Sequence, residues 1–327
     1  MIATHRRILA ALAVLCLTFF VAACGDDEKS DSGSTGGAAA SDDSKVIAKD
    51  PANASKGTIA VGSKNFTEQF ILGEIYAQTL EAEGYKVRRR LNLGSEQVAY
   101  KALKGGTIDM YPEYTGTALT SFFNVKTKDV PPDADQAYEE AKAGYAKNGI
   151  TALARTPFQN TYIISSTKET AEKEGNPKTV SELMAKNPNL SISGFPECRQ
   201  RQDCLLGLRS VYGFKGKFVS SDGKFSDLDG GQSDLTLAFS TDPQLALTDK
   251  YAAYEDDKKF FPPYNITLGI KNATFTKLGD KTIDTLEAVQ EGMTEEAMRE
   301  LNRRVELDKQ EPKAVAAAYL KEEGFVE

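Results

Sequence analysis

Short apolar runs alternate with amphipathic stretches along the chain from residue 58 onward. The run TIAVGS (58–63) is typical of a β-strand. The next segment, 66–84, has apolar residues at helical spacing and ends at Gly84, a common helix stop. Asn65 and Glu68, three residues apart, predict the cap of this helix. Strand-like, helix-like and strand-like runs follow at 87–93, 95–106 and 107–111. This alternation favours β-α-β units and a largely parallel sheet.

The same alternation returns in the second half of the chain. Strand-like runs lie at 161–166, 190–193 and 236–241, and helix-like runs lie at 205–213, 294–308 and 312–324. A single compact sheet rarely needs so many units, so we expect two α/β lobes with a cleft between them. Ligands of open parallel sheets bind beyond the carboxyl ends of the strands.

One segment at such a strand end carries candidate chemistry. The run 107–111 is expected to end at Pro112, which places Tyr114 just past the strand, and 115–123 begins like a helix with Thr115 as its cap. A helix start attracts an anion and an aromatic face attracts a cation, so one small molecule with both charges would suit the pair. Taken alone, the segment fits a core tyrosine in an ordinary turn better.

Composition narrows the function classes. The chain has 40 Lys and Arg against 47 Asp and Glu, so its net charge of -7 gives no electrostatic reason to expect nucleic acid. The one histidine is His5, near the N-terminus, which excludes histidine-based nucleophiles and metal ligands from the rest of the chain. No phosphate-binding loop occurs, and we expect no metal and no cofactor. Carboxylates are available for enzyme chemistry, but their spacing does not select it: Asp109, Glu113, Asp256 and Asp257.

The N-terminus has the pattern of an export signal. Arg6 and Arg7 precede an apolar run at 8–21, which is shorter than the roughly 20 residues of a membrane-spanning helix. The sequence VAAC (21–24) resembles the lipobox of bacterial lipoproteins, which implies cleavage before Cys24 and a lipid on its sulfur. Residues 25–56 lack aromatic side chains and are rich in Gly, Ala, Ser and Asp, which is typical of a disordered tether. We therefore expect a lipid-anchored protein outside the cytoplasm.

The cysteines agree with export. Of the four cysteines, Cys16 lies in the expected signal and Cys24 is the expected lipid site, which leaves Cys198 and Cys204. An even pair outside the cytoplasm is most simply a disulfide, and a structural zinc site would need four ligands.

Several short motifs, read together, resemble a known family. They are GSKNFTEQ (62–69), YPEYTGT (111–117), QNTY (159–162), FSTD (239–242), YEDDKKFFPPYN (254–265) and MTEEAMRELNRRVELD (293–308). In order and spacing they resemble the substrate-binding proteins of ABC importers for glycine betaine, choline and related osmoprotectants. The resemblance implies a type II periplasmic-binding-protein fold, an α/β fold of two lobes. The expected boundaries are 1–23 for the signal, 24–56 for the lipidated cysteine and tether, 57–159 and 264–327 for lobe 1, and 160–263 for lobe 2.

The family holds a quaternary ammonium group in a cage of aromatic rings, and its motifs place that cage here at Tyr114, Tyr162, Phe239 and Tyr264. Many relatives have tyrosine where this chain has Phe239, so one hydroxyl is missing. The resemblance places the ligand's carboxylate near Lys64, Thr117 and Arg201, with Asn160 near the cation. Arg201 matches by register, although Arg199 is close. Trimethylammonium groups offer no hydrogen-bond donor, which is why aromatic faces suit them.

Three hypotheses follow. The first is a monomeric, lipid-anchored receptor that captures a glycine-betaine-type zwitterion and delivers it to a membrane permease served by a separate ATPase. On this view choline is disfavoured, because it would leave Lys64 and Arg201 unpaired. The second is the same fold binding another solute, such as ergothioneine, carnitine, choline or a cationic amino acid. The third is an extracytoplasmic enzyme that uses paired carboxylates.

Overall fold

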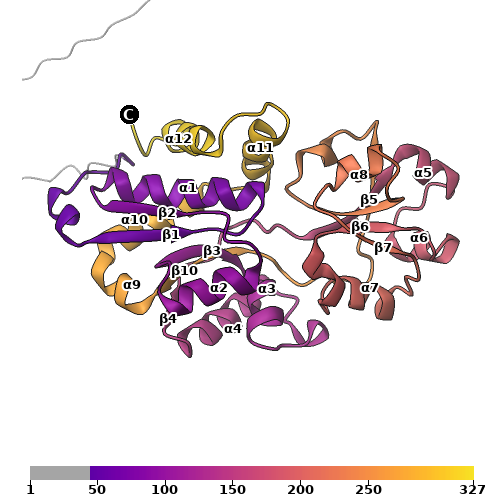
Figure 1. Ribbon diagram of the computed structural model, residues 1–327, viewed down its shortest axis with the longest axis horizontal. Coiled ribbons are helices and arrows are strands. Elements are labelled where there is room, and N and C mark those ends of the chain that lie inside the picture. Colours follow the sequence, from indigo (N-terminus) through magenta and orange to yellow (C-terminus); the bar gives the residue numbers. More distant parts are fainter. Residues whose placement is uncertain (1–44) are drawn as a thin grey trace, which may run out of the picture. The chain divides into compact units, whose positions relative to one another are not determined.

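The computed structural model describes residues 45–327, so the expected signal, Cys24 and most of the expected tether lie outside the described residues. The described part contains two five-stranded sheets, each covered by helices (Figure 1). This is the two-lobed α/β architecture expected from the sequence. Among the described residues, no helix is long and apolar enough to cross a membrane.

The first sheet has the strand order β2-β1-β3-β10-β4. Its strands are β1 (Thr58–Gly62), β2 (Lys86–Arg90), β3 (Met110–Tyr114), β4 (Ile150–Ala152) and β10 (Ile266–Lys271). The helices of this lobe are α1 (Thr67–Ala82), α2 (Glu96–Gly105), α3 (Thr115–Thr117), α4 (Ala134–Ala146), α9 (Asn272–Leu278), α10 (Asp280–Glu291), α11 (Glu295–Glu306) and α12 (Pro312–Glu322). The C-terminal helices α10, α11 and α12 all contact α1, so the end of the chain returns to the first lobe.

The second sheet has the strand order β7-β6-β8-β5-β9. Its strands are β5 (Tyr162–Thr167), β6 (Ile192–Gly194), β7 (Phe218–Ser220), β8 (Leu235–Phe239) and β9 (Tyr251–Tyr254). Its helices are α5 (Lys168–Lys173), α6 (Val180–Lys186), α7 (Leu205–Val211) and α8 (Phe225–Asp229). The strand and helix ranges read from the sequence agree with these elements to within a few residues.

The expectation of largely parallel sheets is wrong, because both sheets are mixed. Strands β1, β2 and β3 pair in parallel, as do β6, β7 and β8. By contrast, β10 runs antiparallel to β3 and β4, and β5 runs antiparallel to β8 and β9. The strands β5 and β10 each begin just after the chain has crossed from one lobe to the other. The start of β10 therefore lies beside the carboxyl end of β3, and the start of β5 lies beside the carboxyl end of β8.

Two local expectations are also corrected. The strand expected to end before Pro112 runs through it to Tyr114, because β10 pairs with all five residues of β3 while the pairing with β1 ends at Met110. Asn65 does not cap α1: the helix begins after Phe66 without a side-chain cap, and Asn65 is exposed. Instead, the side chain of Gln69 bonds the Lys64 N–H (3.0 Å) and the Pro112 carbonyl (3.0 Å), which fixes the turn between β1 and α1.

The end of the expected tether is ordered, which corrects the boundary at 56. Residues 51–55 form a turn of 3-10 helix, and the Asp50 carboxylate caps it by accepting the Ala52 N–H at 2.9 Å. Asn53 is buried and donates to the carbonyl of Glu83 at 2.8 Å, and the N–H of Ile47 donates to the carbonyl of Phe325 at 2.9 Å. Hydrogen bonds therefore order a segment whose composition is too polar to order itself.

Cys198 and Cys204 form a disulfide, with 5.2 Å between their Cα atoms. Both cysteines are buried. The bridge closes a loop in which a 3-10 turn, Pro196–Gln200, is followed by Arg201. The loop therefore lies at the carboxyl end of β6, on the side of the sheet where a ligand would be expected.

Candidate ligand-binding site

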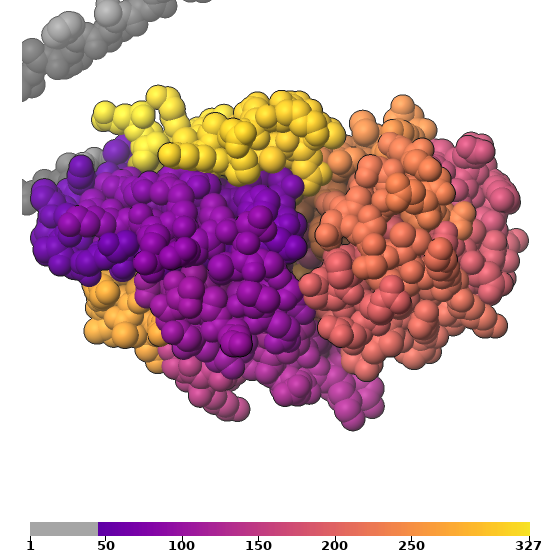
Figure 2. Space-filling model, viewed as in Figure 1, coloured from indigo at the N-terminus to yellow at the C-terminus, as the bar shows by residue number. Residues whose placement is uncertain are grey.

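A cavity of about 550 Å³ is lined by residues of both sheets. Figure 2 shows the surface hollowed between the first lobe, in indigo and purple, and the second lobe, in orange. All eight residues predicted to contact a ligand line this cavity: Tyr114, Tyr162, Phe239, Tyr264, Lys64, Thr117, Arg201 and Asn160. The topology brings them together. In the first sheet β1 and β3 end and β10 begins beside the cavity, and in the second sheet β8 ends and β5 begins there.

Three of the four predicted rings are in direct contact, and the fourth, Tyr114, stands apart from them. Tyr162 lies 5.0 Å from Tyr264 and 5.7 Å from Phe239, centroid to centroid. Tyr114 reaches Phe239 only through Phe66, whose ring lies 6.1 Å from Tyr114 and 5.6 Å from Phe239. Tyr114, Tyr162 and Tyr264 are almost completely buried, whereas Phe239 is partly exposed.

Two rings that the sequence reading missed complete the lining. Phe66 and Phe195 both line the cavity and are partly exposed, and Phe195 lies 5.9 Å from Tyr162 and 6.3 Å from Phe239. Phe66 lies inside the motif GSKNFTEQ, two residues after Lys64, and Phe195 lies three residues before Cys198. Both positions follow a strand that ends at the cleft, and that signal was available in the sequence. We call these six residues the ring cluster: Phe66, Tyr114, Tyr162, Phe195, Phe239 and Tyr264.

Gly116 serves the ring cluster rather than a ligand. A Cβ atom at this position would lie 2.7 Å from the carbonyl oxygen of Pro263 and 2.8 Å from the ring of Tyr264. Such distances are far inside van der Waals contact. The glycine of the TGT turn therefore lets the Tyr264 ring pack against α3.

Lys64 already has a carboxylate partner. Its ammonium group donates to Glu113, which is fully buried and also accepts hydrogen bonds from the Tyr111 hydroxyl and the Tyr114 N–H. The Lys64 nitrogen lies 4.4 Å from the centroid of the Tyr114 ring. Part of the Tyr114 ring is thus occupied by a cation of the protein itself.

Arg201 is paired as well. Its guanidinium bonds both oxygens of Asp203, at 2.8 and 2.5 Å, and lies 3.4 Å from the Thr117 hydroxyl and 3.7 Å from Glu96. Asp203 also accepts hydrogen bonds from Tyr264 (2.7 Å) and Thr120 (3.1 Å). Burial favours the neutral form of Asp203, but the Arg201 charge and these hydrogen bonds outweigh it, so the pKa of this carboxyl lies below its usual value.

The two neighbouring arginines, Arg199 and Arg201, lie in different surroundings. Arg199 is exposed, does not line the cavity and lies over the ring of Phe218 at 5.2 Å. Arg201, by contrast, is buried in the cavity wall. Arg201 and Asp203 belong to the second lobe, and their contacts with Thr117, Thr120 and Glu96 join it directly to the first lobe.

Glu68 is a buried group that the sequence reading placed only as a helix cap. Its carboxylate accepts four side-chain hydrogen bonds, from the Tyr114 hydroxyl (2.7 Å), Asn160 (2.9 Å), the Thr241 hydroxyl (2.6 Å) and Asn302 (3.4 Å). Burial raises the pKa of Glu68 above its usual value, although the four hydrogen bonds act in the opposite direction.

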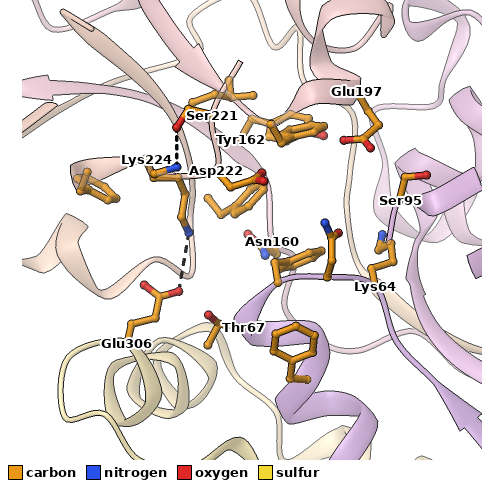
Figure 3. A pocket seen from close by; sticks show the side chains of 18 of the residues that line it. Lys64, Thr67, Ser95, Asn160, Tyr162, Glu197, Ser221, Asp222, Lys224 and Glu306 are labelled. Carbon is orange, nitrogen blue, oxygen red and sulfur yellow. Dashed lines mark hydrogen bonds and ion pairs between the residues drawn. The ribbon is translucent and has the colours of Figure 1, made fainter. Parts of the chain in front are cut away.

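The cavity has a second polar end. In Figure 3, Ser221, Asp222, Lys224 and Glu306 lie on one side of the view and Lys64, Ser95 and Glu197 on the other. Lys224 pairs with Asp242 and lies 3.8 Å from Glu306 of α11, while its nitrogen is 5.1 Å from the Phe239 centroid. Lys224 to Glu306 is a second contact between the second lobe and the C-terminal part of the first.

Comparison with known proteins decides the family. A family model described as the substrate-binding domain of ABC-type glycine betaine transport systems matches residues 57–322. This chain belongs to that family. It is therefore a substrate-binding protein of an ABC-type transport system, and the family is not one of enzymes.

Curated relatives of this chain are named for different solutes. The glycine-betaine-binding protein of Pseudomonas aeruginosa is 30% identical over 290 residues, 82% of this chain and 89% of the relative. The ergothioneine transport permease/ergothioneine binding protein of Helicobacter pylori is 29% identical over 281 residues. That match covers 84% of this chain and 49% of the relative, so the chain spans about half the length of this relative.

Solved structures share the fold. A glycine betaine/carnitine/choline ABC transporter structure matches with a TM-score of 0.64 and 26% identity, over 81% of this chain and 98% of the other. The ligand-free YehZ protein of Escherichia coli matches with a TM-score of 0.61 and 26% identity, over 82% of this chain and 99% of the other.

Proposed function

We propose that the protein binds a quaternary-ammonium zwitterion of the glycine betaine type in this cavity and delivers it to a membrane permease. The observation that carries the proposal is the meeting of six aromatic rings with the donors of Lys64, Arg201 and Thr117 in one cavity. Rings suit a trimethylammonium group, and the donors suit a carboxylate.

The ammonium group is proposed to lie against Tyr162, Phe239 and Tyr264, with Phe66 and Phe195 extending the apolar wall. Each cation–π contact is worth about 0.5 to 2 kcal/mol. Lys64 already covers part of the Tyr114 ring. Tyr114 therefore offers a ligand less of its ring face than an uncovered cage tyrosine would. The partly exposed phenylalanines offer the most accessible surface.

The carboxylate is proposed to meet Lys64, Arg201 and Thr117. Their internal partners use only part of their donors: an ammonium group has three N–H bonds and a guanidinium has five. The expectation that choline would leave Lys64 and Arg201 unpaired is therefore wrong. Choline would not leave the two cations unpaired, since Glu113 and Asp203 neutralise them. The preference for a zwitterion therefore rests on the remaining donors and on the two curated relatives described above, whose named solutes, glycine betaine and ergothioneine, both carry a carboxylate.

A larger betaine is the second candidate, and the cavity favours it. Small-molecule sites commonly occupy about 300 to 1,000 Å³, whereas glycine betaine has only eight non-hydrogen atoms. The lobes are already joined by direct contacts at Arg201 and at Lys224, so the volume of about 550 Å³ is not the result of separated lobes. The end near Asp222 and Lys224 leaves room for a further polar group, as in carnitine or ergothioneine.

We further propose that the protein acts as a monomer outside the cytoplasm, held at the membrane by a lipid on Cys24, and that its permease is served by a separate ATPase. Ligand-driven closure of the two lobes would present the surface that the permease reads. Fatty-acid labelling in growing bacteria tests the anchor. Labelled protein that loses its label in Cys24→Ala supports the anchor, and a label that persists there contradicts it.

Calorimetric titration of the purified protein tests the solute. Glycine betaine, carnitine, ergothioneine, choline and arginine are titrated in parallel. The proposal predicts micromolar binding, about -8 kcal/mol, for at least one of the three zwitterionic betaines, with arginine silent. Silence from all quaternary ammonium compounds, or binding of arginine alone, would contradict it.

A further inference from the structure

Glu68 lies behind the cavity wall and holds two residues that form it. It does not line the cavity itself. Its Oε1 accepts hydrogen bonds from the Tyr114 hydroxyl at 2.7 Å and from the Asn160 amide at 2.9 Å, and both of these side chains line the cavity. One carboxylate oxygen therefore fixes the position of a cage ring and the orientation of a neighbouring amide.

The other oxygen of Glu68 contacts different parts of the molecule. Its Oε2 accepts hydrogen bonds from the Thr241 hydroxyl, just after β8 in the second lobe, at 2.6 Å, and from Asn302 of α11 at 3.4 Å. Asn302 also donates to the carbonyl of Thr241 at 3.1 Å. Neither residue lines the cavity. Through these bonds, Glu68 of α1 in the first lobe is joined to the second lobe and to α11.

Burying these polar groups costs folding free energy. Glu68 is buried, and among residues 45–327 it forms no ion pair. A buried carboxylate without a cation is expensive to maintain. In addition, the Oδ1 atoms of both Asn160 and Asn302 are buried without a hydrogen-bond partner in the described part of the chain. Both amides have turned their N–H groups to Glu68 and left their own acceptors unsatisfied.

We propose that Glu68 is a positioning residue that couples the ligand site to the closed arrangement of the lobes. The inference rests on the proposed function. When Thr241 and Asn302 reach Oε2, the carboxylate is held in the orientation in which Oε1 fixes Tyr114 and Asn160. The ring and amide are then in place only when the second lobe is in place. Ligand binding and lobe closure stabilise each other for this reason.

The first test replaces Glu68 by an isosteric amide. Glu68→Gln replaces one accepting oxygen by an NH2 group, which only donates, so two of the four donors lose their partner. We expect glycine betaine, or whichever betaine the wild-type protein binds, to bind at least about tenfold more weakly. The matched control is Glu74→Gln, because Glu74 is also a buried carboxylate of α1 but pairs with Arg89 and does not line the cavity. Its affinity should stay within about twofold of the wild type.

The second test addresses Oε2 alone and serves if Glu68→Gln does not fold. Thr241→Val removes one donor to Oε2 without touching the cavity, and we expect about a threefold to tenfold loss of affinity. Thr79→Val is the control, since Thr79 is a buried threonine of α1 that bonds the carbonyl of Ile75. In the Thr241→Val/Glu68→Gln double variant, the two losses should not multiply, because they remove the same interaction.

The outcomes separate the inference from the proposed function. Wild-type affinity in Thr241→Val, or losses that multiply in the double variant, would overturn the positioning role while leaving the betaine site in place. A wild-type protein that binds no betaine would overturn the proposed function and this inference with it. Weakened binding in both variants with unchanged controls supports the coupling.

Discussion

At the scale of single residues, each of three cationic side chains that line the cavity contacts both a carboxylate and an aromatic ring of the protein itself. Lys64 pairs with Glu113, Arg201 with Asp203 and Lys224 with Asp242, and each cation also lies near a ring of the cluster. A ligand must therefore compete with internal cations for aromatic faces. The predicted residues were found by motif, whereas these pairings follow from three-dimensional proximity that no motif encodes.

Phe239 offers the cleanest test of an aromatic face, because it is partly exposed and its ring forms no hydrogen bond. Phe239→Leu keeps an apolar side chain but removes the π face. We expect a quaternary ammonium ligand to bind about 2-fold to 30-fold more weakly, the equivalent of one cation–π contact. The control is Phe275→Leu, at a partly buried phenylalanine of α9 that does not line the cavity. Equal affinities of Phe239→Leu and the wild type in calorimetry would remove Phe239 from the ammonium site.

Arg201 tests the carboxylate end. Arg201→Lys retains a cation for the buried Asp203 but loses the planar fork of donors. We expect the affinity for glycine betaine to fall by about tenfold and the affinity for choline to change little, because choline has no carboxylate. If both ligands lose affinity equally, the carboxylate site lies elsewhere.

The raised pKa of Glu68 predicts a pH effect on stability. The carboxyl is protonated more readily in the folded protein, so its stabilising contribution is present below the unfolded pKa, near 4.5, and is lost as the pH rises through the folded pKa. The direct hydrogen-bond partners of Glu68 are neutral, so burial is the main cause of its raised pKa. Denaturant unfolding should show the stability of the wild type, relative to Glu68→Gln, falling as the pH rises from about 4. A difference that does not change with pH would contradict this.

At the scale of elements, the loops at the strand ends set the site. The Cys198–Cys204 loop carries Arg201 into the cavity wall, where it pairs with Asp203, and the TGT turn carries Thr117. The sequence located both loops because their residue types are unusual. It placed the end of β3 wrongly, since Pro112 is tolerated there only where the pairing with β1 has already ended. It also assigned Glu68 to a cap, because the partners of Glu68 come from four distant segments.

The disulfide should stabilise this loop. Its cysteines are six positions apart, and closing so short a loop is worth about 2 kcal/mol by chain entropy. We expect the Cys198→Ser/Cys204→Ser variant to lose about that much free energy of unfolding and to bind a betaine more weakly, because Arg201 is less firmly held. Mass analysis without reductant should find the wild type lighter than its reduced form by the mass of two hydrogen atoms. Free thiols in that experiment would refute the bridge.

At the scale of the whole molecule, the alternation of strands and helices predicted two α/β lobes, and the structure has two sheets. The parallel arrangement was overestimated because the strands that follow each crossover, β5 and β10, enter their sheets antiparallel. Local patterns cannot show this, since the direction of a strand depends on where the chain last left the other lobe. The antiparallel direction of β5 places Tyr162 beside Phe239, at the end of β8. The antiparallel direction of β10 places Tyr264, just before that strand, near Tyr114 at the end of β3.

The measurement that tests the central claim most directly compares glycine betaine with 3,3-dimethylbutanoate, in which carbon replaces the ammonium nitrogen. The two molecules have the same shape and the same carboxylate, so only the positive charge differs. If the ring cluster recognises a cation, calorimetric titration should show glycine betaine binding at least about tenfold more tightly. Equal affinities would mean that the rings act as an apolar pocket, and they would contradict recognition of a quaternary ammonium group.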